Sequence, residues 1–401
     1  MGVNQLSETP ASLRMHIAVF GRTNSGKSSI INAVTGQQVS LVSEVSGTTT
    51  DPVSKSMELY PLGPCVFIDT AGFNDETELG QLRTDRTREV LKKTDMAILL
   101  VSAEQTEYRE EKLWLELIRE RKIPVVGVLN KSDLVDDTKE MLEMLKQELG
   151  MPFVPVSAVS GSGIEQLKSK LVEAAPRDFE QPSITGHLVR EGDSVLLVMP
   201  QDIQAPKGRL ILPQVQTIRD LLDHKAVITS VTTDKMEAAL AAFHNPPDLI
   251  ITDSQVFSYV YERKPEASKL TSFSALMARY KGDIAVFAEG AQALDHLKET
   301  DRVLIAEACT HNPLDGDIGR VKIPNMLRKK VGQGLTIDVV NGSSFPEDLS
   351  PYALVVHCGG CMFNRRYMLD RVRSAKGQQV PITNYGILIA KASGILDKII
   401  L

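Results

Sequence analysis

Residues 21–28, of sequence GRTNSGKS, constrain the fold more than any other stretch of this 401-residue chain. They follow a short apolar run, residues 17–20, and open a helical pattern that extends to residue 34. A strand, a glycine-rich turn and a helix in this order are the context in which such a turn binds phosphate groups. Backbone N–H groups and the helix N-terminus hold the phosphate oxygens in such loops. We therefore predict a nucleotide-binding α/β domain here, in preference to an ordinary glycine-rich turn.

The next apolar run ends in residues that complete a triphosphate site. Lys27 is expected to reach the β- and γ-phosphates, and Ser28 to ligate Mg²⁺. After the strand pattern at residues 65–68, Asp69 is expected to hold the metal through water, and the Gly72 N–H to meet the γ-phosphate. The loop residues expected to contact the nucleotide are Gly21, Asn24, Ser25, Gly26, Lys27, Ser28 and Ser29.

The base of the nucleotide can also be predicted. Asn130, Lys131 and Asp133 follow a later apolar run. A carboxylate accepts hydrogen bonds from N1 and N2 of guanine, and adenine does not offer that pair of donors. Ser157 and Ala158 follow the last strand pattern of this region and are expected to lie behind the bound base. The sequence therefore predicts a guanine nucleotide.

Strand and helix patterns alternate through the whole chain, which predicts an α/β protein. The first domain, residues 1–178, is expected to be a doubly wound sheet that ends in a polar, proline-bearing linker. Residues 183–265 carry a second, smaller α/β pattern without a catalytic constellation, and residues 266–401 carry a third. A chain of this length commonly holds two or three domains.

Three of the 4 cysteines follow short apolar runs in the third domain. Cys309 and His311 follow one run, and His357, Cys358 and Cys361 follow another. Ligands collect beyond the carboxyl ends of parallel strands, so two such ends could bring the cysteines together. Three thiolates suit an iron–sulfur cluster, and with a histidine they also suit zinc. The alternatives are small apolar residues at strand ends, or a redox dithiol that leaves Cys309 without a role.

Composition narrows the class of function. The net charge of -6 and the pI near 5.8 give no general attraction to nucleic acid. The nearest approach to a basic patch is Arg365, Arg366, Arg371 and Arg373, which on a helix are more typical of a solvated or docking face. We see no apolar run of membrane-spanning length and no signal-peptide core. Because Cys65 lies in an unrelated strand and the other cysteines accompany histidines, we expect a reducing, cytoplasmic location.

The first domain resembles the translation-factor-like GTPases in the order of its four strand-end motifs. Residues 46–51, SGTTTD, resemble the first switch of the TrmE/Era branch, which has an arginine where this chain has Thr50. The resemblance implies that Thr49 ligates Mg²⁺ in the GTP state and that Asn24 helps to bind an activating K⁺. Phe73 stands where Ras-like proteins position water with a glutamine, unless it is a core or interface residue. We expect slow GTP hydrolysis that K⁺ stimulates.

A TrmE-like GTPase domain ahead of Cys309 and His311, and of His357, Cys358 and Cys361, resembles the GTPase maturation factors of [FeFe]-hydrogenase, the HydF family. The resemblance spans the chain as a GTPase domain, a dimerisation domain and a cluster domain. It implies a [4Fe-4S] cluster held by the three cysteines. It also implies a scaffold that carries a diiron precursor to apo [FeFe]-hydrogenase, with radical-SAM maturases as partners and a C2 homodimer.

Three questions stay open. Each of His311 and His357 is either a cluster ligand or a hydrogen-bond donor that orients a sulfide or thiolate. The alternative function is a TrmE/Era-like GTPase that acts on RNA and carries structural zinc, which the acidic charge disfavours. GTP is expected to order residues around Thr49 and residues 69–73, and so to switch partner affinity rather than drive chemistry at the cluster.

Overall fold

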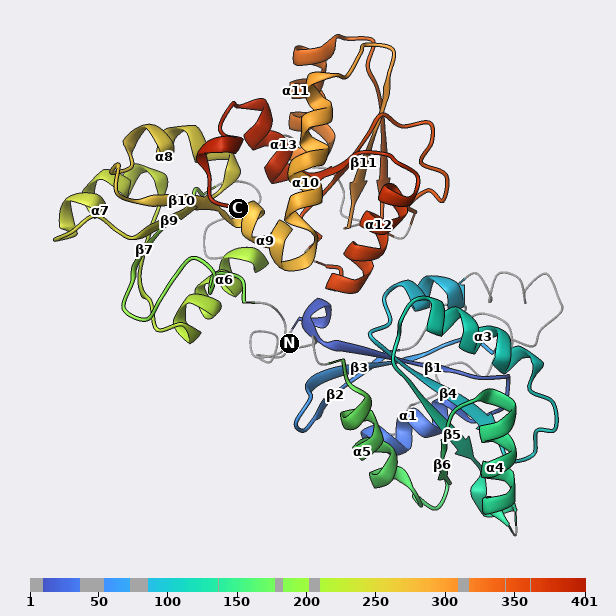
Figure 1. Ribbon diagram of the computed structural model, residues 1–401. Helices are drawn as coiled ribbons and strands as arrows, with labels where there is room; N and C mark the ends of the chain where they lie inside the picture. Colours follow the sequence, from blue (N-terminus) through green and yellow to red (C-terminus); the bar gives the residue numbers. More distant parts are fainter. Residues whose placement is uncertain are drawn as a thin grey trace, which may run out of the picture. The chain divides into compact units, whose positions relative to one another are not determined.

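The computed structural model describes residues 10–36, 54–72, 86–135, 137–176, 183–201, 210–308, 317–342, 344–360 and 362–401. The chain divides into two compact units, Met1–Glu180 and Gln181–Leu401 (Figure 1). Each unit consists of short, mostly parallel strands that alternate with helices. The predicted α/β class is therefore confirmed.

The first unit is one sheet with the strand order β2-β3-β1-β4-β5-β6, in which only β2 and β3 pair antiparallel. Successive side chains of a strand point to opposite faces, so Ile17 and Phe20 enter different cores. Helices α1 and α5 cover one face, and α3 and α4 cover the other. The strands are β1 (Met15–Phe20), β2 (Ser54–Leu59), β3 (Gly63–Asp69), β4 (Met96–Ser102), β5 (Val125–Asn130) and β6 (Phe153–Val156). The helices are α1 (Lys27–Thr35), α3 (Arg109–Glu120), α4 (Thr138–Leu149) and α5 (Ile164–Ala174). This is the predicted doubly wound arrangement.

The second unit contains two four-stranded parallel sheets, with the orders β10-β9-β7-β8 and β12-β11-β13-β14. The strands of the first are β7 (Ser194–Val198), β8 (Val227–Val231), β9 (Leu249–Thr252) and β10 (Lys269–Ser272). Those of the second are β11 (Arg302–Glu307), β12 (Thr336–Asn341), β13 (Leu354–His357) and β14 (Ile382–Asn384). One buried core joins Leu196 and Ile250 of the first sheet to Leu304 and Val355 of the second.

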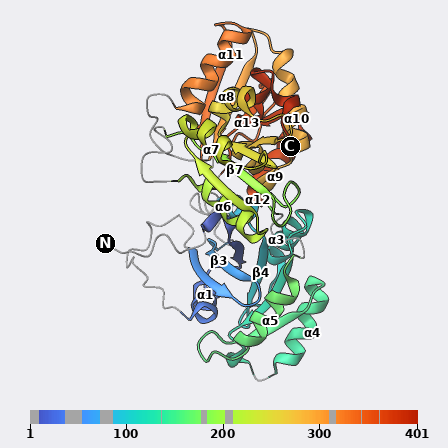
Figure 2. The same ribbon diagram turned by 90° about the vertical axis from the view of Figure 1, so that its left-hand side faces the viewer.

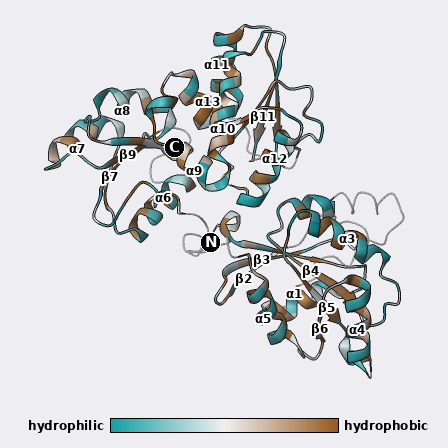
Figure 3. Cartoon of the chain, in the orientation of Figure 1, coloured by the Kyte–Doolittle hydropathy of each residue, from teal (hydrophilic) through white to brown (hydrophobic). Residues whose placement is uncertain are grey.

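Eight helices of the second unit connect and cover these two sheets in the described residues. They are α6 (Leu212–Asp223), α7 (Met236–Ala242), α8 (Phe257–Arg263), α9 (Phe273–Lys281), α10 (Ile284–Ala291), α11 (Ile323–Val331), α12 (Arg365–Gly377) and α13 (Tyr385–Ala392). Helices α9, α10 and α13 pack together between the two sheets (Figures 1 and 2). Apolar residues concentrate on the strands and on the helix faces that cover them (Figure 3).

Several elements were not predicted from the sequence. Strand β10 pairs with β9, so the first sheet of this unit extends past residue 265, where we had expected the domain border. Strand β2 alternates exposed and partly buried residues at a sheet edge, and β14 is only three residues long. Neither gives the continuous apolar run that identifies a buried strand.

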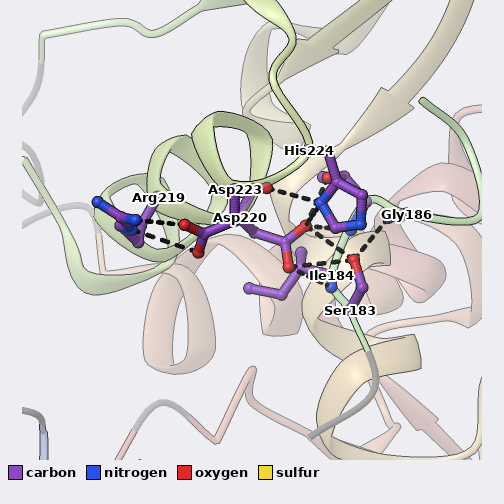
Figure 4. Close-up of polar contacts among 8 residues, drawn as sticks. Ser183, Ile184, Gly186, Arg219, Asp220, Asp223 and His224 are labelled. Atoms are coloured by element: carbon purple, nitrogen blue, oxygen red, sulfur yellow. Dashed lines mark hydrogen bonds and ion pairs between the residues drawn. The ribbon is translucent and has the colours of Figure 1, made fainter. Parts of the chain in front are cut away.

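A partly buried carboxylate, Asp220, holds the start of the second unit against α6. Asp220 accepts hydrogen bonds from Ser183 Oγ at 3.0 Å, Ile184 N at 3.0 Å and Thr185 N at 2.7 Å (Figure 4). His224 Nδ1 contacts the Asp220 carbonyl oxygen at 2.8 Å, one helical turn further on. These contacts fix the chain directly after the predicted linker.

Within the part of the chain that the structure describes, no helix is both long and apolar enough to cross a membrane. The predicted cytoplasmic location stays a prediction.

Replacing Ile98 with alanine should destabilise the first unit by about 2–5 kcal/mol, because it leaves a cavity in a fully buried part of β4. Met144→Ala on α4 is the control, since Met144 is 40% exposed; its effect should stay below about 1 kcal/mol. Trp114 is the only tryptophan and stacks on Phe20, so its fluorescence during urea unfolding reports this unit. Equal midpoints for the two variants would contradict the assigned core.

Candidate functional site

The turn between β1 and α1 has the shape of a phosphate-binding loop. Asn24 and Gly26 have positive φ angles of 63° and 93°, and Gly26 is the N-cap of α1. The Lys27 side chain folds back over the loop, where Nζ donates to the carbonyl oxygens of Gly21 at 3.1 Å and Arg22 at 2.9 Å. The loop and helix N-terminus that the sequence predicted are thus present.

Three of the residues expected to bind Mg²⁺ and the phosphates, Lys27, Ser28 and Asp69, lie together. Ser28 Oγ donates a hydrogen bond to Asp69 Oδ2. Burial lowers the pKa of Lys27, and the negative charge of Asp69 partly offsets this shift. Burial also raises the pKa of Asp69, and the hydrogen bond from Ser28 and the positive charge of Lys27 partly offset that shift. A buried ammonium and a partly buried carboxyl therefore lie close together, where a polyphosphate and a bound cation would each find an opposite charge.

Gly72 comes close to the phosphate-binding loop. A Cβ atom at this position would lie 2.3 Å from Thr23 Oγ1 and 2.5 Å from Thr23 N, so only glycine fits. Thr70 Oγ1 donates to the Val19 carbonyl oxygen at 2.7 Å and ties this segment to β1. The Gly72 backbone is thereby brought beside the loop. Thr49, Thr50 and Phe73 lie outside the described residues.

Asn130 joins the phosphate-binding loop to the predicted base-binding segment. Its Nδ2 donates to the Ser25 carbonyl oxygen at 2.9 Å, and its Oδ1 accepts from Ala158 N at 3.3 Å. Ser157 N donates to Ser162 O at 3.0 Å. Asp133 is exposed in the short helical turn Ser132–Leu134 that follows β5. The geometry brings the ends of three strands into one site.

The other predicted residues of this region lie close by. Lys131 adopts a left-handed conformation with a φ of 61° and pairs with Glu104. Ser29 is exposed on the first turn of α1, and Ser25 is buried beneath the loop. Like Lys27, both residues lie in the segment that directly follows β1.

An ion pair between a buried carboxylate of α3 and partly exposed Arg22 supports the loop, and the sequence analysis missed it. Glu111 is fully buried, and its Oε1 accepts from Arg22 Nε at 3.2 Å. Glu111 shares the buried face of α3 with Trp114, Leu115 and Ile118. A carboxylate at an apolar helical position is a signal that could have identified it.

The second candidate site lies where β11 and β13 end. These strands are parallel neighbours, with Ala306 opposite His357. Cys358 N donates to Ala306 O at 2.9 Å, and Ala308 N donates to Cys358 Sγ at 3.0 Å. Ala308 directly precedes Cys309 in the sequence. The two strand ends that carry cysteines are therefore adjacent, as the sequence predicted.

Cys309, His311 and Cys361 lie outside the described residues. Among the residues that the structure does describe, no group of three or more His, Cys, Asp or Glu side chains could hold a metal ion. Cys65 is buried in β3 of the first unit, and burial raises the pKa of its thiol to about 12. It has no part in this second site.

His357 is fully buried, and both of its ring nitrogens contact protein groups. Nε2 lies 2.7 Å from Arg371 Nη1, and Nδ1 lies 2.7 Å from Cys358 O. Arginine only donates, so Nε2 accepts and Nδ1 carries the proton that is donated to Cys358 O. Burial and Arg371 lower the pKa of His357 to about 3, so the ring is neutral. In this geometry His357 orients Cys358 and offers no free nitrogen to a metal.

A second buried carboxylate, also missed from the sequence, is the last residue of β11. Glu307 is 3% exposed, and its Oε2 accepts from Arg320 Nε and Nη2, both at 3.0 Å. It sits two residues before Cys309. Its position at the end of an apolar strand is the same signal that marks Asp69 in the first unit.

Comparison with protein families accounts for both units. Residues 16–131 match the model described as 50S ribosome-binding GTPase. Residues 184–282 match the hydrogen maturase F dimerization domain, and residues 285–401 match the hydrogen maturase F tetramerization domain. The latter two models together span more than half of the chain.

The chain belongs to the hydrogen maturase F family. Its first unit is a GTPase domain, and its second unit holds the two oligomerisation domains of that family.

Curated GTPases match less than half of this chain. GTPase Der of Wolinella succinogenes is 32% identical over 179 residues, which are 43% of this chain and 37% of that protein. The tRNA modification GTPase MnmE of Chromobacterium violaceum is 33% identical over 176 residues, 43% of this chain and 38% of that protein. The match thus spans well under half the length of either relative.

Among solved structures, NFeoB from S. thermophilus bound to GDP.AlF4- and K+ is 26% identical. The match covers 40% of this chain and 62% of that chain, with a TM-score of 0.33. Era in complex with MgGDPNP and nucleotides of 16S ribosomal RNA is 18% identical over 57% of this chain and 98% of that chain, with a TM-score of 0.36.

Asn130→Ala should weaken GTP binding about tenfold or more, because a buried carbonyl and a backbone N–H each lose a partner worth about 1–3 kcal/mol. Asn32→Ala is the control, since its Oδ1 accepts from Lys55 at 2.9 Å in the same unit and not from the loop. Calorimetric titration with GTP measures both affinities. Unchanged binding by a folded Asn130→Ala variant would contradict the role assigned to this side chain.

Proposed function

We propose that this member of the hydrogen maturase F family is a GTP-hydrolysing scaffold for hydrogenase maturation. It holds a [4Fe-4S] cluster and assembles or delivers the diiron subcluster to apo [FeFe]-hydrogenase. The observation that carries the proposal is the hydrogen bond from Ala308 N to Cys358 Sγ, which joins the ends of two adjacent parallel strands. A sulfur that accepts a backbone N–H is stabilised as a thiolate, the form that binds iron.

The residues at this strand end fit a cluster. Cys309, Cys358 and Cys361 are the proposed ligands, and thiolates are the usual ligands of iron–sulfur clusters. Gly360 has a φ of 61°, which turns the loop between Cys358 and Cys361. When bound, a cluster held by three thiolates offers one iron without a cysteine, which can take an exchangeable group. His311 remains a candidate for that position, whereas His357 acts by orienting Cys358.

The GTPase domain performs the hydrolysis. Lys27 and Gly72 bind the terminal phosphates, and Asp69 with Ser28 and Thr49 holds Mg²⁺. Asn24, exposed on the loop in a left-handed conformation, is the proposed contact for K⁺. Asn24, Lys27 and Ser28 lie on the phosphate-binding loop and the first turn of α1, and Asp69 and Gly72 lie beside them.

The nucleotide acts as a switch rather than as a reagent for the cluster, because the two sites belong to different compact units. GTP orders the segments around Thr49 and after Asp69, and hydrolysis releases them. The proposed consequence is a change in affinity for the radical-SAM maturases and for apo [FeFe]-hydrogenase. Oligomerisation of the second unit, beginning with a C2 homodimer, presents these surfaces in pairs.

Cys358→Ala should lose the cluster, whereas Cys65→Ala should keep it, because Cys65 lies in the core of the other unit. The test is anaerobic reconstitution with iron and sulfide, followed by metal analysis and EPR of the reduced protein. About four irons per chain in the unmodified protein and in Cys65→Ala, with a cubane signal absent from Cys358→Ala, is the expected result. One zinc and no iron would end this proposal and favour a GTPase with a structural metal.

Lys27→Ala should reduce GTP hydrolysis about 10²-fold or more, because the transferred phosphate loses its buried cation. Iron content should not change, since the loop and the cysteines are in different units. Lys112→Ala is the control: its side chain is 47% exposed and pairs with Glu148 on the surface. Phosphate release and iron content are measured on all three proteins, and loss of iron in Lys27→Ala would contradict independent sites.

A further inference from the structure

A lysine from outside the cysteine region reaches the loop that carries the cysteines. Lys281 is the last residue of α9 and is 1% exposed. Its Nζ donates to Gly360 O at 3.1 Å and to Phe363 O at 2.8 Å. Removing an ammonium from water is costly unless other groups hydrogen-bond to it, and here two carbonyl oxygens do so.

The two carbonyl groups bracket a proposed cluster ligand. Gly360 directly precedes Cys361, and Phe363 follows two residues later. Phe363 N also donates to Gly360 O at 2.9 Å, which closes a turn. Lys281 therefore sets both the shape of this loop and its local charge.

Lys281 comes from the other oligomerisation domain. The dimerization model ends at residue 282 and the tetramerization model begins at residue 285, so α9 belongs to the first and the cysteine loop to the second. Two hydrogen bonds donated in the opposite direction also join the two domains. Arg365 Nε donates to Tyr280 O at 3.1 Å, and Asn384 Nδ2 donates to Ser274 O at 3.4 Å. Helix α9 also packs against α6 of the dimerization domain.

A second buried cation acts on the opposite end of the loop. Arg371 of α12 is 3% exposed and lies within 5 Å of the ring centroids of Phe345, Phe363 and Tyr367. Its Nη1 contacts His357, which in turn donates to Cys358 O. Two buried cations thus contact this loop and its neighbour His357. A thiolate-bound cluster gains negative charge when reduced, and a nearby buried cation favours that state.

We propose that Lys281 is a positioning residue of the cluster site, supplied by the dimerization domain, which shapes the Cys358–Cys361 loop and makes the bound cluster easier to reduce. This inference rests on the proposed cluster function. It also makes the cluster site a joint product of the two oligomerisation domains.

Lys281→Met removes the charge, and Lys281→Arg keeps it. EPR-monitored redox titration of the reconstituted full chain measures the fraction reduced at each potential. At a fixed potential the oxidised-to-reduced ratio should rise about tenfold in Lys281→Met, equal to a midpoint about 59 mV lower. Lys281→Arg should stay nearer the unmodified value. Lys376→Met, which removes an exposed lysine of α12, is the control and should leave the midpoint potential unchanged.

Hydrogen exchange on the unmodified chain tests the same link without a substitution, should Lys281→Met fail to fold. The Gly282 N–H bonds to Ala278 O at 3.0 Å in the last turn of α9 and serves as the reporter. Exchange in this turn should be slower with the cluster than after its removal by a chelator, and exchange in α3 of the GTPase domain should not change.

The outcomes separate this inference from the function beneath it. An unmodified chain without iron overturns the proposed function. Iron in the unmodified chain, with equal midpoints for Lys281→Met and Lys376→Met, overturns the role of Lys281. If Lys281→Met does not fold, the exchange measurement decides. Equal hydrogen-exchange rates in the last turn of α9 with and without the cluster would then overturn the role of Lys281.

Discussion

Parallel pairing of neighbouring strands is the constraint on which both sites of this chain depend. In the first unit β1, β3, β4 and β5 run side by side, and their carboxyl ends deliver the phosphate-binding loop, Asp69 and Asn130 to one edge. In the second unit β11 and β13 do the same for Cys358 and the residue before Cys309. Right-handed crossovers through helices leave that edge open, so side chains distant in sequence meet there.

Much of this arrangement follows from the sequence because its signals are local. The segment after β1 requires positive φ at Asn24 and Gly26, and the apolar runs before Asp69, Asn130 and Cys358 are long enough to identify buried strands. Strand β10 escaped prediction because its Lys269–Ser272 sequence mixes polar and apolar residues, and its place is decided by pairing with β9. Tertiary context outweighs local propensity at such a short strand.

The side chains that support the sites were harder to predict. Glu111, Lys281 and Arg371 are charged residues on helices, and sequence patterns place such residues on solvated faces. Here each is buried and holds backbone or side-chain groups of a site loop: Arg22, the carbonyls of Gly360 and Phe363, or His357. Arg371 shows the difference most clearly, since the sequence favours an exposed basic face for it and the structure encloses it among three aromatic rings. Long-range packing decides these positions, and no local pattern encodes it.

The most direct test of the account is the location of iron in the anaerobically reconstituted protein, from anomalous scattering at the iron absorption edge. The account predicts one compact group of iron peaks beside Cys358 Sγ, at the carboxyl ends of β11 and β13, within bonding distance of Cys309 and Cys361. Iron bound elsewhere in the chain, or a single metal ion at this position, would contradict it.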